Sequence, residues 1–217
     1  MAKDPHGLLE PNRSTKLLLM RHPQTVKNVE ARYQGRSNAP LSELGREQCT
    51  RAVKGLVAWQ PEKLYSSPLS RCLAIAEPVA EALGLELQID ERLLEIDFGA
   101  VEGFTHDEAI AQGLSFPWDP STGPWPVSGA EPLEDFVART AAVASDLAAL
   151  EGRIAAVTHG GAVRGIFSCW MHIPVEHLWM MSVRNVESSC FSVDAEGLVY
   201  LDAHGLKPEW LSKGNAA

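Results

Sequence analysis

Residues 17–23 read LLLMRHP, an apolar run of four residues followed directly by arginine, histidine and proline. A short apolar run of this kind predicts a buried strand. Pro23 has no backbone N–H for a strand ladder, so the sequence predicts a turn there. In open α/β sheets, ligands bind outside the carboxyl ends of the strands. We therefore expect Arg21 and His22 to lie at a ligand-binding edge of a sheet.

A second stretch near the other end of the chain has the same construction. Residues 154–161 read IAAVTHGG, so another short apolar run ends in a histidine, His159, and two glycines follow. This pattern predicts a strand, a turn and then a helix that begins just past His159. Two histidines at two strand ends, one of them beside an arginine, indicate a site for an anion.

The middle of the chain contributes two further polar residues. Residues 64–71 read LYSSPLSR, which predicts a strand, a turn and a helix with Ser67 as its N-cap and Pro68 at its first position. Arg71 would then lie in the first helical turn, near the same sheet edge. Residues 94–99, LEIDFG, place the carboxyl group of Glu95 within a mostly apolar stretch.

Strands and helices are predicted to alternate along the chain, which is typical of βαβ units and a mainly parallel sheet. The fold class is therefore α/β. In the helix that contains Pro78, a kink or an early break is expected. The predicted strands are 16–20, 63–66, 86–89, 154–157, 190–193 and 198–202, and the predicted helices are 42–59, 69–83, 105–112, 133–150 and 162–171.

The chain of 217 residues suits a single domain, predicted at 16–217, after a flexible polar tail at 1–15. Residues 99–130 are rich in glycine and proline but also contain aromatic residues, Trp118 and Trp125 among them. Long loops in compact domains are often functional, and aromatic residues argue against disorder. We interpret this insertion as a lid over the site.

Composition excludes several classes of partner. The net charge of −9 disfavours binding to nucleic acid or to an anionic membrane surface. No apolar run approaches the ~18 residues that span a bilayer. The four cysteines show no metal-ligand spacing and are expected to be free thiols in the cytoplasm. The expected partner is a small molecule, and the oligomeric state, a homodimer included, is left open.

Taken in order, these motifs resemble the histidine phosphatase superfamily, the phosphoglycerate-mutase-like proteins, over roughly residues 16 to 170. The resemblance implies a three-layer α/β/α fold with a mainly parallel central sheet. Two positions depart from the family pattern: Pro23 replaces a glycine, and Asn38 stands where an aspartate is common, which is expected to affect a loop contact. The motifs are RHP at 21–23, YQGR at 33–36, PLSELG at 40–45, the turn to Arg71, the Glu95 segment and THG at 158–160.

The resemblance implies phosphoryl transfer to a histidine. A neutral imidazole avoids the repulsion that an anionic nucleophile meets at a phosphomonoester, which suits His22. Its other ring nitrogen should donate to a backbone carbonyl and so fix the tautomer. Arg21 and Arg71 would bind the phosphoryl oxygens, and His159 would donate a further hydrogen bond.

Glu95 is the predicted general acid for the leaving group and then the base for water. Apolar surroundings and the phosphate charge would keep its carboxyl group protonated before the transfer. The scheme needs no metal and no cofactor. Further residues predicted to contact phosphate or substrate are Thr25, Asn28, Gln34 and Gly160, with Trp118 and Trp125 in the lid.

Two activities fit the resemblance, a phosphatase and a cofactor-dependent phosphoglycerate mutase. A mutase must grip a polyanion, yet residues 93–138 contain no lysine or arginine, so Arg32, Arg36 or Arg92 would have to supply those cations. We therefore favour a phosphatase whose substrate bears one phosphate on a weakly charged or aromatic body. The segment around Glu95 is also similar to that of α-ribazole phosphatases. A binding protein without turnover is a third interpretation, and Pro23 is its support.

Overall fold

The computed structural model describes residues 15–114 and 127–212 of the chain. These residues form a six-stranded sheet with the strand order β3-β2-β4-β1-β5-β6. The first four strands in this order are parallel to one another, whereas β5 and β6 are antiparallel to their neighbours. The mainly parallel α/β sheet is therefore confirmed. The strands are β1 (Thr15–Arg21), β2 (Lys63–Ser66), β3 (Leu87–Ile89), β4 (Arg153–Thr158), β5 (Ser188–Val193) and β6 (Val199–Leu206).

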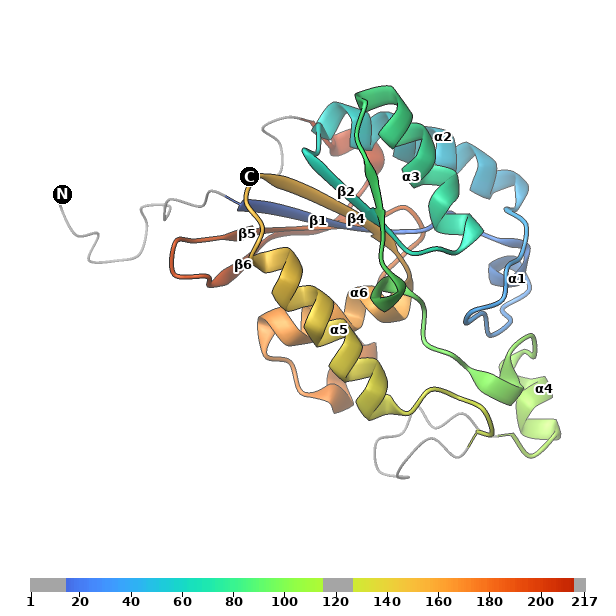
Figure 1. Ribbon diagram of the computed structural model, residues 1–217. Coiled ribbons are helices and arrows are strands. Elements are labelled where there is room, and N and C mark those ends of the chain that lie inside the picture. The colour runs from blue at the N-terminus through green and yellow to red at the C-terminus, as the bar shows by residue number, and fades with distance from the viewer. Residues whose placement is uncertain (1–14, 115–126, 213–217) are drawn as a thin grey trace.

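Helices cover both faces of the sheet and make three layers (Figure 1). On one face α2 (Glu43–Trp59) and α3 (Ser70–Leu83) pack against Leu18 and Met20. On the other face α5 (Leu133–Ala148) and α6 (Gly160–Met171) lie over a cluster that contains Leu17 and Leu19. Because successive strand residues point to opposite faces, a central strand buried on both faces must be apolar throughout. This explains the uninterrupted LLLM run.

The start of α3 differs from the prediction. Ser67 is not its N-cap, because the helix begins at Ser70 with Leu69 as an N-cap that makes no side-chain hydrogen bond. The first turn is capped instead from a distance, since Asn38 Oδ1 accepts a hydrogen bond of 3.1 Å from the Ser70 N–H. Asn38 thus makes a loop contact, as its departure from the family pattern predicted.

Pro78 does not end α3, which continues to Leu83 and is terminated by Gly84 in the left-handed conformation. A proline leaves the carbonyl four residues earlier without its helical partner. That carbonyl belongs to Ala74, and the thiol of Cys49 on α2 donates to it at 3.0 Å. The contact between the two helices explains why the early break does not occur, and the alternative, a kink at Pro78, stays a prediction.

The remaining helices are short. Ile96, Phe98 and Phe136 belong to a third apolar cluster, which packs the described part of the 99–130 insertion onto the domain. Trp118 and Trp125 lie outside the described residues. These elements are α1 (Val26–Val29), η1 (Glu91–Leu93), η2 (Gly99–Val101), α4 (His106–Ala111), η4 (Val175–Met180) and η5 (Pro208–Trp210).

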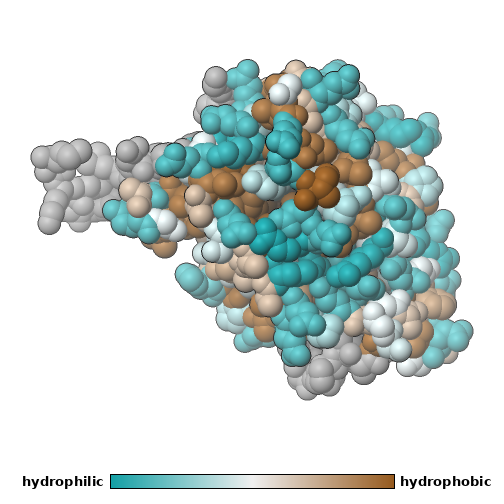
Figure 2. All heavy atoms as spheres, in the orientation of Figure 1, coloured by the Kyte–Doolittle hydropathy of each residue, from teal (hydrophilic) through white to brown (hydrophobic). Residues whose placement is uncertain are grey.

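The surface seen in Figure 2 carries mostly hydrophilic residues, with apolar residues exposed between them. Within the described ranges, every helix is too short or too polar to cross a membrane.

Candidate active site

The two histidines meet because β1 and β4 are parallel neighbours in register. Arg21 pairs with Thr158, so the residues that follow them, His22 and His159, leave the sheet side by side. The His22 N–H donates to the Thr158 carbonyl at 2.9 Å, and the two imidazole centroids lie 5.2 Å apart. The predicted convergence of the two strand ends is therefore observed.

His22 is buried, with 3% of its surface exposed. Its Nδ1 lies 2.7 Å from the Pro23 carbonyl oxygen, which can only accept, so Nδ1 carries the proton. Burial lowers the pKa of the His22 imidazole well below its usual 6.5, and the charges of Arg21 and Arg71 lower it further. The ring is consequently neutral near pH 7, and Nε2 keeps its lone pair.

His159 is fully buried and has the opposite tautomer. Arg71 Nε, which can only donate, lies 3.2 Å from His159 Nδ1, so the proton resides on Nε2. Nε2 lies 2.7 Å from Ser67 Oγ and donates to it. Burial and the neighbouring Arg71 lower the pKa of His159 well below 6.5. Both ring nitrogens thus have protein partners, and a hydrogen bond to phosphate would require Nε2 to leave or share Ser67.

Arg71 is held rigidly although it is charged and only 1% exposed. Its guanidinium donates to the carbonyls of Gly35 at 2.7 Å and Ser37 at 3.0 Å, besides His159. Three of its five N–H groups are used in this way, and two are left for an anion. A Cβ on Gly35 would lie 2.6 Å from the Ile96 carbonyl, so only glycine brings this loop close enough.

The buried Nε of Arg21 is an unused donor. Its Nη1 donates to the Val183 carbonyl at 2.7 Å, whereas its buried Nε has no hydrogen-bond partner among the described residues. Burial lowers the pKa of Arg21 to about 10, and the opposing charge of Glu95 limits the decrease. The group is therefore still protonated at neutral pH.

Glu95 does not have the apolar surroundings that the sequence predicted for its carboxyl group. Neighbouring side chains do enter the apolar clusters, but the carboxyl oxygens accept from the N–H groups of Ile96 and Gly161, each at 3.0 Å. Its charge also acts on Arg21 and Arg164. The difference arises because the Glu95 side chain points to the start of α6 rather than into the core. A Cβ on Gly161 would lie 2.2 Å from Glu95 Oε1, so a larger residue there would displace the Glu95 carboxyl group.

Thr25, Asn28 and Gln34 bond mainly to one another. Thr25 Oγ1 donates to Gln34 Oε1 at 2.6 Å, and Asn28 Oδ1 accepts from the Thr25 N–H at 3.1 Å. Thr25 also caps α1. These contacts make the three residues supports of the loop after His22, and their predicted contact with substrate stays a prediction. Gly160 opens α6, where the free N–H groups of a helix start attract anions.

Sequence reasoning missed several residues of this site. Ser67 was assigned only as a helix cap, yet it binds His159. Asn185 donates to the His22 carbonyl at 2.9 Å from a segment distant in sequence. Arg164, one helical turn after Gly160, donates to the Met181 carbonyl at 2.9 Å. Ser67 could have been found from its position in the SSPLSR turn, and Arg164 from its i,i+4 spacing to Gly160. The local sequence carries no such signal for Asn185.

Within the described part of the chain, no group of three or more histidine, cysteine, aspartate or glutamate side chains is arranged to hold a metal ion.

Three comparisons relate this geometry to known proteins. The model of the histidine phosphatase superfamily (branch 1) matches residues 17–203. Glucosyl-3-phosphoglycerate phosphatase of Mycobacterium tuberculosis is 33% identical over 175 residues, which cover 75% of this chain and 78% of the relative. A solved complex of the mycobacterial glucosyl-3-phosphoglycerate phosphatase with VO3 is 28% identical, with a TM-score of 0.76, and covers 88% of this chain and 99% of that one.

The α-ribazole phosphatase of Shigella flexneri has a similar structure, with a TM-score of 0.78 over 88% of this chain and 96% of that one. At 22% identity, this likeness concerns the fold.

Proposed function

The chain belongs to the histidine phosphatase superfamily (branch 1), and from this membership we propose that it cleaves its substrate through a phosphohistidine on His22. The enzyme is a phosphoric monoester hydrolase, like its named relatives. One observation carries the choice of nucleophile. His22 donates through Nδ1 to the Pro23 carbonyl and has a strongly lowered pKa, so Nε2 offers a lone pair.

In the first step, His22 Nε2 attacks phosphorus and the bond between phosphorus and the ester oxygen breaks. The unused N–H groups of Arg21 and Arg71 meet the charge that spreads over the phosphoryl oxygens. Glu95 acts as the general acid and transfers a proton to the leaving alkoxide. The products of this step are an alcohol and a phosphohistidine.

In the second step, the Glu95 carboxylate takes a proton from water, and the water oxygen attacks phosphorus. The bond between phosphorus and Nε2 breaks, which releases inorganic phosphate and restores neutral His22. The hydrogen bond from Gly161 to Glu95 keeps the carboxyl group beside the helix start, where an anion would be bound. One carboxyl group can therefore serve both steps.

The arginines that a mutase would need are already neutralised. Each of the three lies within ion-pair distance of two carboxylates, which leaves little positive charge for a second phosphate or a substrate carboxylate. These pairs support a phosphatase with a weakly charged substrate body. They are Arg32 with Glu30 at 2.8 Å and Glu108 at 2.6 Å, Arg36 with Glu131 at 3.3 Å and Asp97 at 3.8 Å, and Arg92 with Asp90 at 2.7 Å and Asp146 at 2.6 Å.

The substrate body that we propose is a sugar or a nucleoside-like group. The name of one relative supports the sugar, because the substrate in that name carries a glucosyl group. The nucleoside-like alternative is supported by the segment around Glu95, which is similar to that of α-ribazole phosphatases. We also propose that the enzyme acts in the cytoplasm, which its free thiols support. These thiols are Cys49, Cys72, Cys169 and Cys190.

Rapid quenching of the enzyme during turnover of a labelled phosphomonoester tests the mechanism. We expect an acid-labile phosphoryl adduct on His22, and its absence on a turning-over enzyme would refute the proposal. A panel of sugar, nucleoside and glycerate phosphates tests the substrate class. Rapid conversion of 3-phosphoglycerate to 2-phosphoglycerate with catalytic 2,3-bisphosphoglycerate would show a mutase instead.

A further inference from the structure

Residues 183–187, between η4 and β5, hold the arginine of the site through backbone groups. The Arg21 N–H donates to the Glu187 carbonyl at 3.2 Å, and the Val186 N–H donates to the Arg21 carbonyl at 3.0 Å. The Val183 carbonyl accepts from Arg21 Nη1 at 2.7 Å. This segment therefore continues the antiparallel pairing beyond the start of β5, to the last residue of β1.

The peptide between His22 and Pro23, just after β1, can form a hydrogen bond on one side only. The bond between His22 and Pro23 has no N–H group, because its nitrogen belongs to proline. Only the His22 carbonyl can anchor this peptide by a hydrogen bond, and Asn185 Nδ2 donates to that oxygen at 2.9 Å. The following carbonyl, that of Pro23, is the one that fixes Nδ1 of the His22 ring. The Asn185 side chain thus lies one peptide away from the group that sets the tautomer of the nucleophile.

Backbone strain accompanies this contact. Val186, a buried β-branched residue, has φ of 56° in the left-handed region, which side chains of this kind rarely adopt. Such conformations persist where surrounding contacts over-determine them, and they concentrate at functional sites. Here the Val186 N–H donates to the Arg21 carbonyl, and the side chain of Asn185 donates to the His22 carbonyl.

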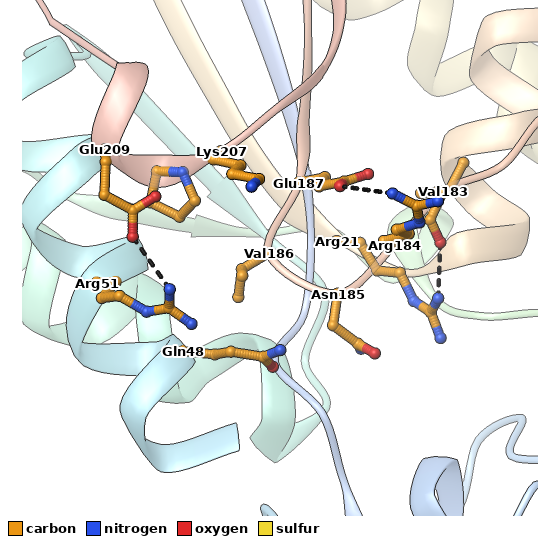
Figure 3. A pocket seen from close by; sticks show the side chains of 11 residues that line it. Arg21, Gln48, Arg51, Val183, Arg184, Asn185, Val186, Glu187, Lys207 and Glu209 are labelled. Atoms are coloured by element: carbon orange, nitrogen blue, oxygen red, sulfur yellow. Dashed lines mark hydrogen bonds and ion pairs between the residues drawn. The ribbon is translucent and has the colours of Figure 1, made fainter. Parts of the chain in front are cut away.

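On its other side the segment borders a cavity. With Arg21, it lines a cavity of about 510 Å³ whose remaining walls come from α2 and from residues 207–209 (Figure 3). Gln48, Arg51 and Lys207 face this space across from Asn185 (Figure 3). Val183 and Val186 of this segment pack into the apolar clusters on the two faces of the sheet, and Asn185 between them is held by its hydrogen bond to His22.

We propose that Asn185 is a positioning residue for the nucleophile. By holding the only anchorable group of the peptide between His22 and Pro23, it keeps the Pro23 carbonyl at Nδ1 and Nε2 aimed at phosphorus. This role rests on the proposed phosphohistidine mechanism.

The test compares Asn185→Ala with Arg184→Ala, a neighbour whose side chain is 77% exposed. Misplacement of a reacting group by about 1 Å can cost about a hundredfold in rate. We expect kcat of Asn185→Ala to fall about tenfold to a hundredfold with KM changed less than about twofold, and Arg184→Ala to match the wild type. Rapid quenching in a single turnover should show phosphohistidine formation slowed by the same factor as kcat.

Asn185→Asp distinguishes loss of the hydrogen bond from loss of folded protein. The aspartate has nearly the same size as asparagine, but its carboxylate can only accept and so cannot donate to the His22 carbonyl. We expect a loss of kcat at least as large as in Asn185→Ala, at an unchanged melting temperature. If both variants form phosphohistidine at the wild-type rate, or lose activity only in proportion to lost folded protein, the role of Asn185 is refuted. If the wild type itself forms no phosphohistidine, the proposed mechanism is refuted instead, so the two failures are distinguishable.

Discussion

The carboxyl ends of β1 and β4 look alike in sequence but are connected in opposite ways. Each strand delivers a buried histidine with a lowered pKa to the same edge. At the β1 end, His22 bonds through Nδ1 to a backbone carbonyl, which leaves Nε2 for attack. At the β4 end, His159 accepts from Arg71 at Nδ1 and donates to Ser67 from Nε2.

In the proposed mechanism, one residue type takes two roles within 5.2 Å. A histidine becomes a nucleophile when one nitrogen is anchored and the other is left unprotonated. It becomes a fixed donor when a guanidinium occupies one nitrogen and forces the proton onto the other. The neighbours of each ring, rather than the strand that carries it, decide between the two.

Of the changes that test this comparison, removal of the β1 histidine should have the largest effect on activity. We expect His22→Ala to lose at least about a thousandfold in kcat, because loss of a nucleophile costs that much or more in other enzymes. Steady-state hydrolysis of a good substrate from the panel measures the loss. His177→Ala, a change at an exposed histidine, is the matched control and should keep full activity. Equal activities of the two variants would remove His22 from the mechanism.

Arg71 connects the two strand ends, since its charge lowers the pKa of both histidines and its Nε binds His159. We expect Arg71→Ala to lose about a hundredfold to a thousandfold in kcat/KM, the range for electrostatic stabilisers. Inhibition by vanadate should weaken in parallel. Strong loss of rate with unchanged vanadate affinity would contradict a phosphoryl-binding role for this arginine.

The β4 histidine should matter somewhat less than the β1 histidine. We expect His159→Ala to lose about a hundredfold in kcat, because it removes one donor and leaves the nucleophile in place. Single-turnover quenching should still detect the adduct on His22, formed slowly. Complete loss of the adduct would mean that the two rings have less distinct roles than their hydrogen bonds indicate.

Ser67→Ala tests the hydrogen bond that orients the His159 ring, because Arg71 still sets the tautomer of that ring. A hydrogen bond contributes about 1 kcal/mol net, so we expect a loss of about fivefold to tenfold in kcat. Ser66→Ala is a matched control, because the neighbouring hydroxyl is equally buried but donates to the Ser67 carbonyl rather than to a histidine. A loss in the control as large as in Ser67→Ala would make the effect one of packing.

The smallest expected effect is on the pH dependence of the free energy of unfolding. Since the folded-state pKa of His22 lies below its unfolded value of 6.5, the unfolded chain binds more protons and stability decreases as pH falls through that value. Between pH 7 and about 5.5 this costs about 1 kcal/mol for each such histidine. Urea unfolding should therefore show that His22→Gln loses about 1 kcal/mol less than the wild type over this range. Identical pH dependences would mean that His22 titrates normally.

The sequence was sufficient to predict the sheet and the strand ends, because those signals are local. Apolar runs of strand length ended at Pro23 and at Gly160, and all six predicted strands are present within a few residues of their expected bounds. The errors were also local, at Ser67 and Pro78, where a contact from a distant loop or helix replaced the expected cap or break.

The convergence of Arg21, His22, Arg71 and His159 followed from strand order and from the family resemblance. The hydrogen-bond partners of these groups could not be predicted, because they come from residues far apart in the chain. Asn185 reaches His22 across 163 positions, and Ser67 reaches His159 across 92. No periodicity or motif records such a contact.

By itself, the sequence therefore determined where an arginine and two histidines would emerge from a sheet, since burial and turn chemistry act over a few residues. Only the tertiary structure decided which ring nitrogen of each histidine carries the proton, that Glu95 bonds to the start of α6, and that Asn185 anchors the peptide before Pro23. Hydrogen bonds have direction and reach only about 3 Å, so they are settled when the distant segments have packed together.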